Sequence, residues 1–320
     1  MEVIKYRIAL ETDKYAIADL LSLSSNHLRP INYWTWINSK TFFPGSFVVL
    51  ATLKDKIVGH YAVSIRKYCI FVVTKKIGVA TQTVIHPSYR KLQILLDISN
   101  FLKAECQKNE LSMVIGFPND NLYRLNTKLL GWIELGEVAQ LEASLDKLTN
   151  CSPFIISNRA LKFDDTFNHL IKFYNSNQNS IKEFLTTDLL NWRYFNHPLN
   201  NYTVFISSDD NGSINGFIVL KIYHKEAELV GHIMEIVTFD DLNTMDYLLE
   251  QAIGYFSWAN CKKISLWCGV NDFKYDYFKK IGLKENQIES HMQVIPLLVD
   301  NNKIFNISHW DLSMRMSDAY

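Results

Sequence analysis

The sequence predicts a mixed α/β fold, present in two tandem copies. In residues 1–146, strand-like and helix-like segments follow the order β-α-α-β-β-β-α-β-α-β, which indicates helices packed on one sheet. A similar order returns in residues 165–320. The third observation is a turn from a strand into a helix at residues 86–91, where the residue types suit an anion.

Hydrophobic periodicity places the elements of the first copy. Alternating apolar and polar residues predict strands, and apolar residues at helical spacing predict helices. The expected strands cover residues 4–10, 46–53, 56–65, 80–85, 111–117 and 131–145, and the expected helices cover 13–24, 31–40, 92–107 and 119–130. Residues 147–164 contain Pro and Ser without a sustained period, so we expect a linker there.

The second copy is supported by spacing. Its expected helices cover residues 163–176, 180–195, 241–258 and 273–282, and its expected strands cover 202–208, 213–223, 229–239 and 263–269, followed by strand-like segments to the end. The interval from Trp36 to Gly59 is almost the same as the interval from Trp192 to Gly216. Each of these residues lies in the same type of element in both copies. Self-similarity at this long period indicates a duplicated domain.

Composition excludes several classes of protein. Of the 320 residues, 48% are apolar, which is too many for a disordered chain. The net charge of +0 gives no field for capturing a nucleic acid polymer or an anionic membrane. No apolar run spans a bilayer, and the first residues lack the apolar core of a secretory signal. The five cysteines match no zinc pattern, so we expect no metal and a reduced, cytoplasmic protein; oligomeric state stays open.

The turn after residue 85 has the chemistry of a phosphate or diphosphate site. A helix that starts directly after a strand leaves its first N–H groups without partners inside the helix. These donors and the positive end of the helix dipole attract an anion, and Arg90 and Lys91 add charge. The alternative is an ordinary strand–helix connection with two solvated cations.

The order of elements, the VIHPSYR turn at 84–90 and the NDNLYRLNTKLLGW segment at 119–132 resemble the GNAT superfamily of acyl-CoA-dependent N-acyltransferases. The second half resembles the same fold more faintly. The segments at 189–198 and 309–320 are similar to those of bacterial tandem enzymes that acylate nucleotide-linked amino sugars, of the dTDP-3-amino-3,6-dideoxyhexose type used in surface polysaccharide synthesis. Two alternatives stay open: an aminoacyl, peptide or antibiotic N-acyltransferase, and a degenerate pair that binds a ligand or partner without catalysis.

The resemblance implies that coenzyme A binds the first copy. The family's pyrophosphate loop corresponds to residues 90–95, but its two small residues are replaced by Gln93 and Leu95. Main-chain donors do not depend on side-chain identity, so a looser site can survive there. Asn119 and Asn121 bond the cofactor's amides or cap the helix that follows. The expected cofactor-binding residues are Thr83, Val84, Ile85, Arg90, Lys91, Leu92, Gln93, Ile94, Leu95, Asn119 and Asn121.

The resemblance also implies catalytic candidates. The family's usual general acid, a tyrosine, corresponds to Thr127, whose hydroxyl is too weak an acid to protonate a thiolate. Tyr123 lies one turn earlier on the same helical face and is the natural replacement, unless it is a half-buried structural residue. His86 is a candidate base, with loop packing as its alternative role.

The second copy is expected to bind the acceptor or to be structural. Its corresponding turn carries Asp240 and Asp241, and two carboxylates would repel a diphosphate. Aromatic and polar residues are expected to form the acceptor site, although core packing is the alternative for each tryptophan. The candidates are Trp34, Trp36, Trp192, Arg193, Tyr194, Asn196, His197 and Trp310.

Overall fold

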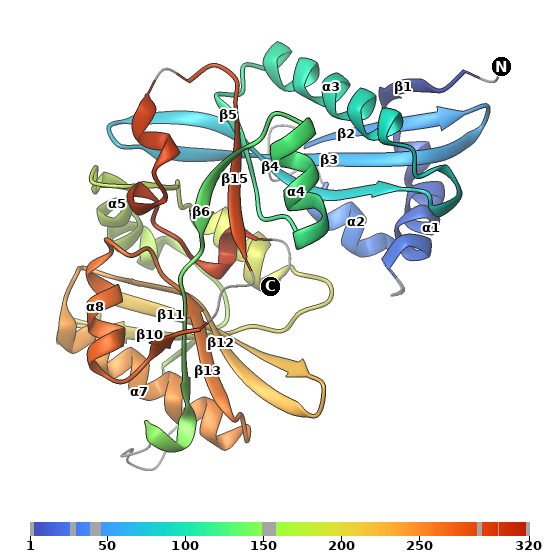
Figure 1. Ribbon diagram of the computed structural model, residues 1–320. Helices are drawn as coiled ribbons and strands as arrows, with labels where there is room; N and C mark the ends of the chain where they lie inside the picture. The colour runs from blue at the N-terminus through green and yellow to red at the C-terminus, as the bar shows by residue number, and fades with distance from the viewer. Residues whose placement is uncertain are drawn as a thin grey trace. The chain divides into compact units, whose positions relative to one another are not determined.

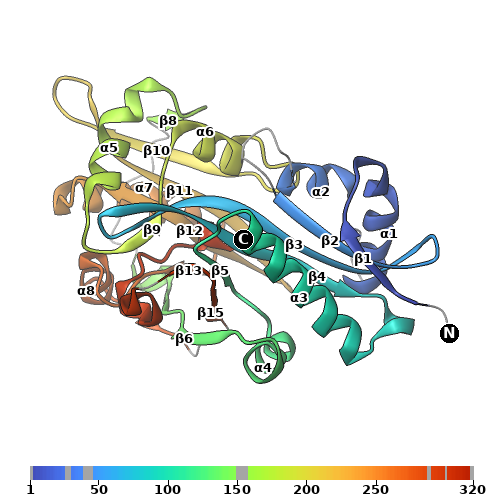
Figure 2. The same ribbon diagram turned by 90° about the horizontal axis from the view of Figure 1, so that it is seen from above.

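A computed structural model describes residues 3–25, 30–38, 46–148, 158–286, 290–299 and 301–317 (Figures 1 and 2). The chain divides into two compact units. The first unit comprises Met1–Tyr68, Thr74–Gly136 and Ser290–Phe305, and the second comprises Cys69–Val73, Glu137–Glu289 and Asn306–Tyr320. Among the described residues, no helix has both the length and the apolar character to cross a membrane.

The first unit is a mixed sheet with helices on both faces. Its strands run in the order β1-β2-β3-β4-β5-β15-β6, with β4 parallel to β5. The strands are β1 (Lys5–Ile8), β2 (Ser46–Leu53), β3 (Lys56–Ile70), β4 (Val73–Ile85), β5 (Met113–Gly116), β6 (Ile133–Glu137) and β15 (His291–Pro296). The helices are α1 (Lys14–Ser25), α2 (Ile31–Ile37), α3 (Leu92–Lys108) and α4 (Asp120–Leu129).

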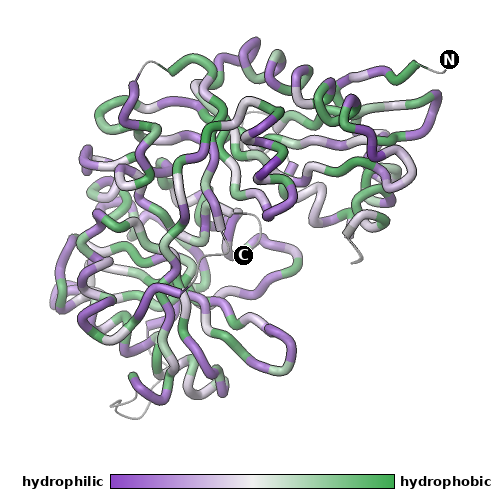
Figure 3. The backbone as a smooth tube through the Cα atoms, viewed as in Figure 1, coloured by the Kyte–Doolittle hydropathy of each residue, from purple (hydrophilic) through white to green (hydrophobic). Residues whose placement is uncertain are grey.

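Alternation along β2 separates the two hydrophobic layers of this unit. Val48 and Leu50 pack with the residues of α1 and α2, whereas Val49 and Ala51 pack with those of α3. Figure 2 shows α3 on one side of the strands and α1 and α2 on the other. Hydrophilic and hydrophobic residues alternate along α3 in Figure 3, as expected for a helix with one buried face. The sheet is therefore the middle layer of the unit.

The second unit has the same plan. Its sheet runs in the order β14-β7-β13-β12-β11-β10-β8. The strands of this sheet are β7 (Gln140–Ser144), β8 (Arg159–Ala160), β10 (Thr203–Ser208), β11 (Ile214–Lys225), β12 (Glu228–Thr238), β13 (Lys263–Trp267) and β14 (Lys284–Glu285). Strand β9 (Ile181–Glu183) belongs to the unit but not to this sheet. The helices of the unit are α5 (Asn168–Ser176), α6 (Thr187–Leu190), α7 (Leu242–Trp258) and α8 (Phe273–Lys280), with a π-helical turn over Asn191–Phe195.

The two units repeat one another in detail. Helices α3 and α7 have 17 residues each. The interval from the start of α3 at Leu92 to the start of β5 at Met113 equals the interval from the start of α7 at Leu242 to the start of β13 at Lys263. The predicted mixed α/β fold class is confirmed, and the two units share these lengths and intervals.

One segment that was predicted to be a single continuous strand consists of two strands. Residues 131–145 form two strands in different sheets, because β6 belongs to the first and β7 to the second. Near the break, Gly136 in β6 has a φ of 135°, a conformation that other residues rarely adopt. Strand β15, from near the carboxyl end, occupies the place between β5 and β6, while β7 lies between β13 and β14. The units accordingly divide after Gly136, not at residue 146 as the sequence suggested.

Three other expectations were corrected. Residues 180–195 were expected to be helical, but they begin with β9, whose three residues are all buried and therefore cannot form one face of an amphipathic helix. The expected linker includes β8, which pairs with β10; its residues 149–157 lie outside the described part of the chain. After β15, the expected strands are replaced by short 3₁₀ turns over Asn302–Phe305, Ile307–His309 and Met314–Met316.

Candidate functional site

The amino-terminal end of α3 is open. His86 and a 3₁₀ turn over Pro87–Tyr89 connect β4 to the helix, and Lys91 is its N-cap residue without a side-chain capping bond. The main-chain N–H groups of Leu92 and Gln93 have no acceptor among the residues that the structure describes. Arg90 and Lys91 are exposed beside them. Main-chain donors, the helix dipole and two cations therefore coincide at this turn.

The large side chains at the start of α3 are directed elsewhere. Ile94 and Leu95 are only 3% and 8% exposed and pack into the core against the sheet. The Gln93 side-chain amide donates to Asp97 at 2.8 Å, one helical turn further along. Leu92 is about half exposed. The residues that replace small ones in this turn therefore leave the main-chain donors available, and the Gln93 amide is engaged within the helix.

Strand β4 separates from β5 before it reaches this turn. The two strands pair only at Gly78–Val114 and Val79–Ile115, although β4 continues to Ile85. Gln82 has a φ of 46°, which marks a distortion of the strand. Both polar atoms of the Gln82 side chain and the Thr81 hydroxyl are buried without a hydrogen-bond partner in the described residues. Thr83, Val84 and Ile85 follow, half-buried. This segment offers polar groups for a ligand that contains amides.

His60 holds the distorted strand in place. Its Nδ1 lies 2.7 Å from the Gln82 carbonyl oxygen, and its Nε2 accepts a bond of 3.3 Å from Trp34 Nε1. Because a carbonyl can only accept, Nδ1 carries the proton and the ring is neutral. Burial lowers the pKa of His60 to about 4. Sequence analysis missed His60 and Gln82; a histidine inside the apolar run of residues 57–65 was the available signal.

The corresponding turn of the second unit is closed. Asp241 is the N-cap of α7, and its carboxylate accepts from the amides of Asn243 at 3.3 Å and Thr244 at 2.9 Å. The Thr244 hydroxyl donates to the same carboxylate at 2.6 Å. These bonds, the one from the Thr244 side chain foremost, lower the pKa of Asp241. The first-turn donors of α7 are therefore occupied by the protein's own anion.

Tyr123 belongs to a small polar cluster in the first unit. Its hydroxyl donates to Glu134 on β6, and its ring stacks on His291 at 4.2 Å between centroids. His291 Nδ1 lies 3.4 Å from the other Glu134 carboxylate oxygen. His291 belongs to β15, the strand from near the carboxyl end that lies between β5 and β6. One member of this cluster therefore comes from a segment far away along the chain. The Thr127 hydroxyl donates to the Tyr123 carbonyl at 3.1 Å, within the helix.

Three more predicted residues lie around these elements. Asn119 caps α4 by accepting from the Leu122 amide at 3.1 Å, which was one of its two expected roles, and Asn121 is exposed. His86 Nδ1 accepts from the Ser88 amide at 3.2 Å, so its free nitrogen carries the proton and does not accept one. Burial and the nearby Lys56 lower the pKa of His86.

The residues expected to bind the acceptor are mostly in the cores. Trp34 is buried against His60, and Trp36 is half-buried beside Tyr33. In the second unit, Trp192, Arg193 and Tyr194 are at most 2% exposed. Packing accounts for the aromatic residues, as the alternative role allowed.

Polar residues of this group are also engaged within the second unit. The Arg193 guanidinium donates to the Tyr202 hydroxyl at 3.3 Å and to the Ser317 carbonyl at 3.0 Å. His197 Nδ1 accepts from two main-chain amides, and burial lowers its pKa to about 3. Asn196 is exposed. Arg193 is therefore engaged inside the second unit and is not exposed to a diphosphate in solvent.

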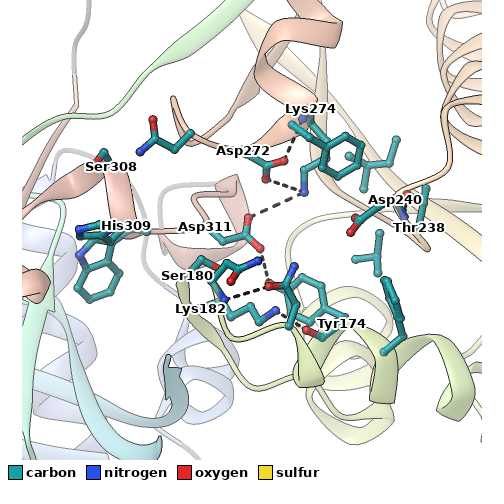
Figure 4. Close-up of a pocket in the computed structure, with 18 residues that line it drawn as sticks. Tyr174, Ser180, Lys182, Thr238, Asp240, Asp272, Lys274, Ser308, His309 and Asp311 are labelled. Atoms are coloured by element: carbon teal, nitrogen blue, oxygen red, sulfur yellow. Dashed lines mark hydrogen bonds and ion pairs between the residues drawn. The ribbon is translucent and has the colours of Figure 1, made fainter. Parts of the chain in front are cut away.

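The second unit contains a cavity of about 320 Å³ (Figure 4). Its wall comes from the end of α5, from β9, from the end of β12, from the start of α8 and from residues 308–311. Of the expected acceptor residues, Trp310 lines it. The wall also carries Asp311, a weaker candidate of the same kind as Trp310, and Lys182, which sequence analysis did not select as a site residue. Long separation along the chain hides such a cluster from an analysis of local pattern.

Comparison with known proteins places the fold. No family model matches the chain, and no curated protein matches it. A solved probable N-acyltransferase from Enterococcus faecalis is similar over 93% of this chain and 73% of its own, with 14% identity and a TM-score of 0.71. A GCN5-related N-acetyltransferase from Anabaena variabilis is similar over 92% and 73%, with 13% identity and a TM-score of 0.71.

A similarity to a more distant solved structure also concerns the fold. The N-myristoyltransferase of Saccharomyces cerevisiae, solved with bound myristoyl-CoA, is similar over 92% of this chain and 83% of its own. The identity is 7% and the TM-score 0.63. At such identities the likenesses establish the fold, which is that of the GCN5-related N-acetyltransferases (GNAT).

Acidification should weaken the first unit through His60. The folded ring has a pKa of about 4 and the unfolded ring one of about 6.5, so the unfolded chain binds more protons between these values. This contribution to stability is complete above pH 6.5 and is lost as the pH falls. Urea unfolding at pH 7 and 5 should show a loss larger by about 2 kcal/mol in the wild type than in His60→Gln. Equal losses would show that His60 is not held neutral.

Proposed function

We propose that the protein is an acyl-CoA-dependent N-acyltransferase whose first unit binds coenzyme A. The observation that carries this proposal is the open end of α3, next to Arg90 and Lys91, where the amides of Leu92 and Gln93 have no acceptor in the described parts of the chain. An anion at such a place gains main-chain hydrogen bonds and charge attraction together. The fold neighbours support the choice of ligand, because one of them contains myristoyl-CoA and two are named as acyltransferases.

The residues present fit this cofactor beyond its diphosphate. The buried Thr81 hydroxyl and Gln82 amide lack partners among the described residues, and a pantetheine chain offers amides that match them. Thr83, Val84 and Ile85 would supply main-chain groups next to them. Acyl-CoA, when bound, supplies the activated acyl group. The second unit is a poor alternative, because Asp241 occupies the donors at its corresponding turn.

The protein's own part in the reaction is to orient an amine and to move one proton. Main-chain N–H groups of β4 beyond its pairing with β5 would stabilise an oxyanion, and one such donor is commonly worth about 3 kcal/mol. Tyr123 is the proposed general acid, with its hydroxyl oriented by Glu134. The stack on His291 fixes the ring. Thr127 is a weaker candidate, since its hydroxyl is bonded to its own helix.

The proposed acceptor is the amine of a nucleotide-linked amino sugar. Support comes from the resemblance of residues 189–198 and 309–320 to enzymes that acylate dTDP-linked 3-amino-3,6-dideoxyhexoses. Part of the second segment, at Trp310, lines the cavity of the second unit. The product of such a reaction would serve surface polysaccharide synthesis.

Lys91→Asp should separate stability from cofactor binding. An aspartate at this N-cap can accept from the free amides of α3, which should raise the free energy of unfolding by about 0.5–1 kcal/mol. The same carboxylate would occupy the diphosphate donors, so affinity for coenzyme A should fall at least tenfold. Urea unfolding and isothermal calorimetry measure the two effects. Lys75→Asp makes the same charge change on the exposed start of β4 and should leave the affinity intact.

A gain in stability with unchanged affinity would place the diphosphate elsewhere and contradict the proposal. Misfolding cannot imitate the expected result, because the variant is expected to be the more stable protein.

Tyr123→Phe should lower kcat by roughly 100-fold, because the departing thiolate loses its proton donor. Affinity for coenzyme A should stay within threefold of wild type, since the ring and its stack on His291 remain. Thr127→Val, which removes a hydroxyl bonded to the helix, should keep kcat within threefold. Thiol release under saturating acyl-CoA measures kcat. A Tyr123→Phe enzyme with wild-type kcat would remove Tyr123 from the mechanism.

The acceptor class can be determined with a panel of amines. With acetyl-CoA, a dTDP-linked 3-amino-3,6-dideoxyhexose should give a kcat/KM at least tenfold above those of a peptide amine and an aminoglycoside. The measurement is release of free thiol, with the product confirmed by mass. A faster peptide or aminoglycoside reaction would contradict the acceptor and retain acyl transfer. No thiol release with any amine, together with no binding of coenzyme A, would contradict the enzyme.

A further inference from the structure

The cavity of the second unit occupies the place where its central strand separates from its neighbour. Strand β12 pairs in parallel with β13 up to Ile233–Leu266 and then continues to Thr238. The cavity begins beyond this point, at Ile236, and extends to the start of α8. Its volume of about 320 Å³ lies at the lower end of the range for small-molecule sites. Since Asp241 closes the neighbouring helix end, this space is not a second diphosphate site.

Part of the cavity wall is an ordered network of charges. Lys274 Nζ lies 2.9 Å from Asp272 and 3.9 Å from Asp311, as the dashed lines in Figure 4 show. The Tyr174 hydroxyl donates to Asp311 at 2.9 Å. Burial works to lower the pKa of Lys274, but the two carboxylates raise it above the usual value, so the lysine is charged. These groups are held in position before any ligand arrives.

Two further charged side chains on the wall, those of Lys182 and Asp240, form no ion pair with any described residue. Lys182 is 2% exposed, and its ammonium donates to the Tyr174 carbonyl and lies 4.4 Å from the centroid of that ring. It forms no ion pair with any described residue, and burial lowers its pKa. The Asp240 carboxylate makes no hydrogen bond or ion pair in the described structure either. A nearly buried ammonium without a carboxylate partner is unfavourable unless something else completes its hydrogen bonds.

The chemistry of the wall identifies what would complete those bonds. Lysines donate only and carboxylates accept only, so a ligand that meets both needs groups that do both, as hydroxyls do. Three carboxylates face two ammonium groups, since Asp240, Asp272 and Asp311 oppose Lys182 and Lys274. The remaining negative charge favours a ligand with one positive charge. Phe273 and Trp310 add apolar surface for the face of a ring.

We propose that this cavity is a binding site for a hydroxylated primary amine of the amino-sugar class, about one hexose in size. Asp240 would bind the ammonium group, and Lys182 and Lys274 would donate to hydroxyl or ring oxygens. The inference deepens the proposed function by giving its acceptor class a binding site, and it rests on that function for the view that the ligand is a substrate. Binding itself requires no coenzyme A.

Calorimetric titration of the full chain without coenzyme A tests the ligand class. The probes are 3-amino-3-deoxyglucose and 2-amino-2-deoxyglucose, with N-acetylglucosamine and glucose as neutral counterparts. At least one amino sugar should bind tenfold more tightly than both neutral sugars. Absence of binding by the amino sugars, or equal binding of the neutral ones, would overturn the proposal.

Variants locate the bound amine. Asp240→Asn should weaken amino-sugar binding about tenfold, because the exposed carboxylate is lost without a change in size. The matched control is Asp210→Asn, which makes the same charge change on an exposed turn of the same unit and should have no effect. Equal affinities in Asp240→Asn and wild type would contradict this location.

Lys182→Met distinguishes a ligand-binding lysine from a structural one. The substitution removes a buried ammonium that has no ion pair with a described residue, so the melting temperature should be unchanged or higher, while amino-sugar affinity falls at least fivefold. A lower melting temperature with undiminished affinity would assign Lys182 to structure and overturn its role. Stabilisation by coenzyme A, measured in parallel, reports on the first unit alone. If coenzyme A gives no stabilisation while the amino sugar still binds, the proposed function is contradicted and the amino-sugar site is not.

Discussion

The functional assignment depends on whether main-chain amides at a strand-to-helix turn are satisfied by the protein itself. Every helix begins with such donors, and most of them are capped, so they are usually not available to bind a ligand. In the first unit the N-cap residue is Lys91, whose side chain donates and cannot cap. In the second unit the N-cap residue is Asp241, whose carboxylate takes two amides and a hydroxyl. One residue type at one position therefore decides whether the first-turn amides are occupied by the protein's own side chain.

The open turn is useful only because the strand before it is also separated from its neighbour. That separation needs support from outside the strand, since Gln82 is held in a left-handed conformation that is unfavourable for a residue with a side chain. His60 and Trp34 supply this support through two hydrogen bonds in the interior. Burial keeps the histidine neutral, which lets one ring nitrogen donate and the other accept. A histidine that resembles a core residue in sequence thus maintains the shape of the candidate site.

Local sequence pattern was sufficient to predict elements whose boundaries depend on neighbouring residues in the chain. The start of α3 at Leu92 and the end of β12 near Thr238 follow from periodicity and from the turn residues. The exchange of β7 and β15 did not follow, because strand pairing between residues far apart along the chain leaves no periodic signal. The burial of residues 192–194 was not predicted for another reason. Buried tryptophans and tryptophans that stack on a ligand have the same local sequence pattern.

The shared plan of the two units places two different chemical environments at equivalent positions. In the first unit the separated strand leads to free amides and exposed cations, which suit a diphosphate. In the second, the amides are capped, and the space beside the strand is surrounded instead by Lys182, Lys274 and three aspartates. A second copy that merely supported the first would gain stability by filling that space with apolar side chains, because buried charges are more costly than packed hydrocarbon. The charged cavity is therefore better explained by a ligand than by the fold.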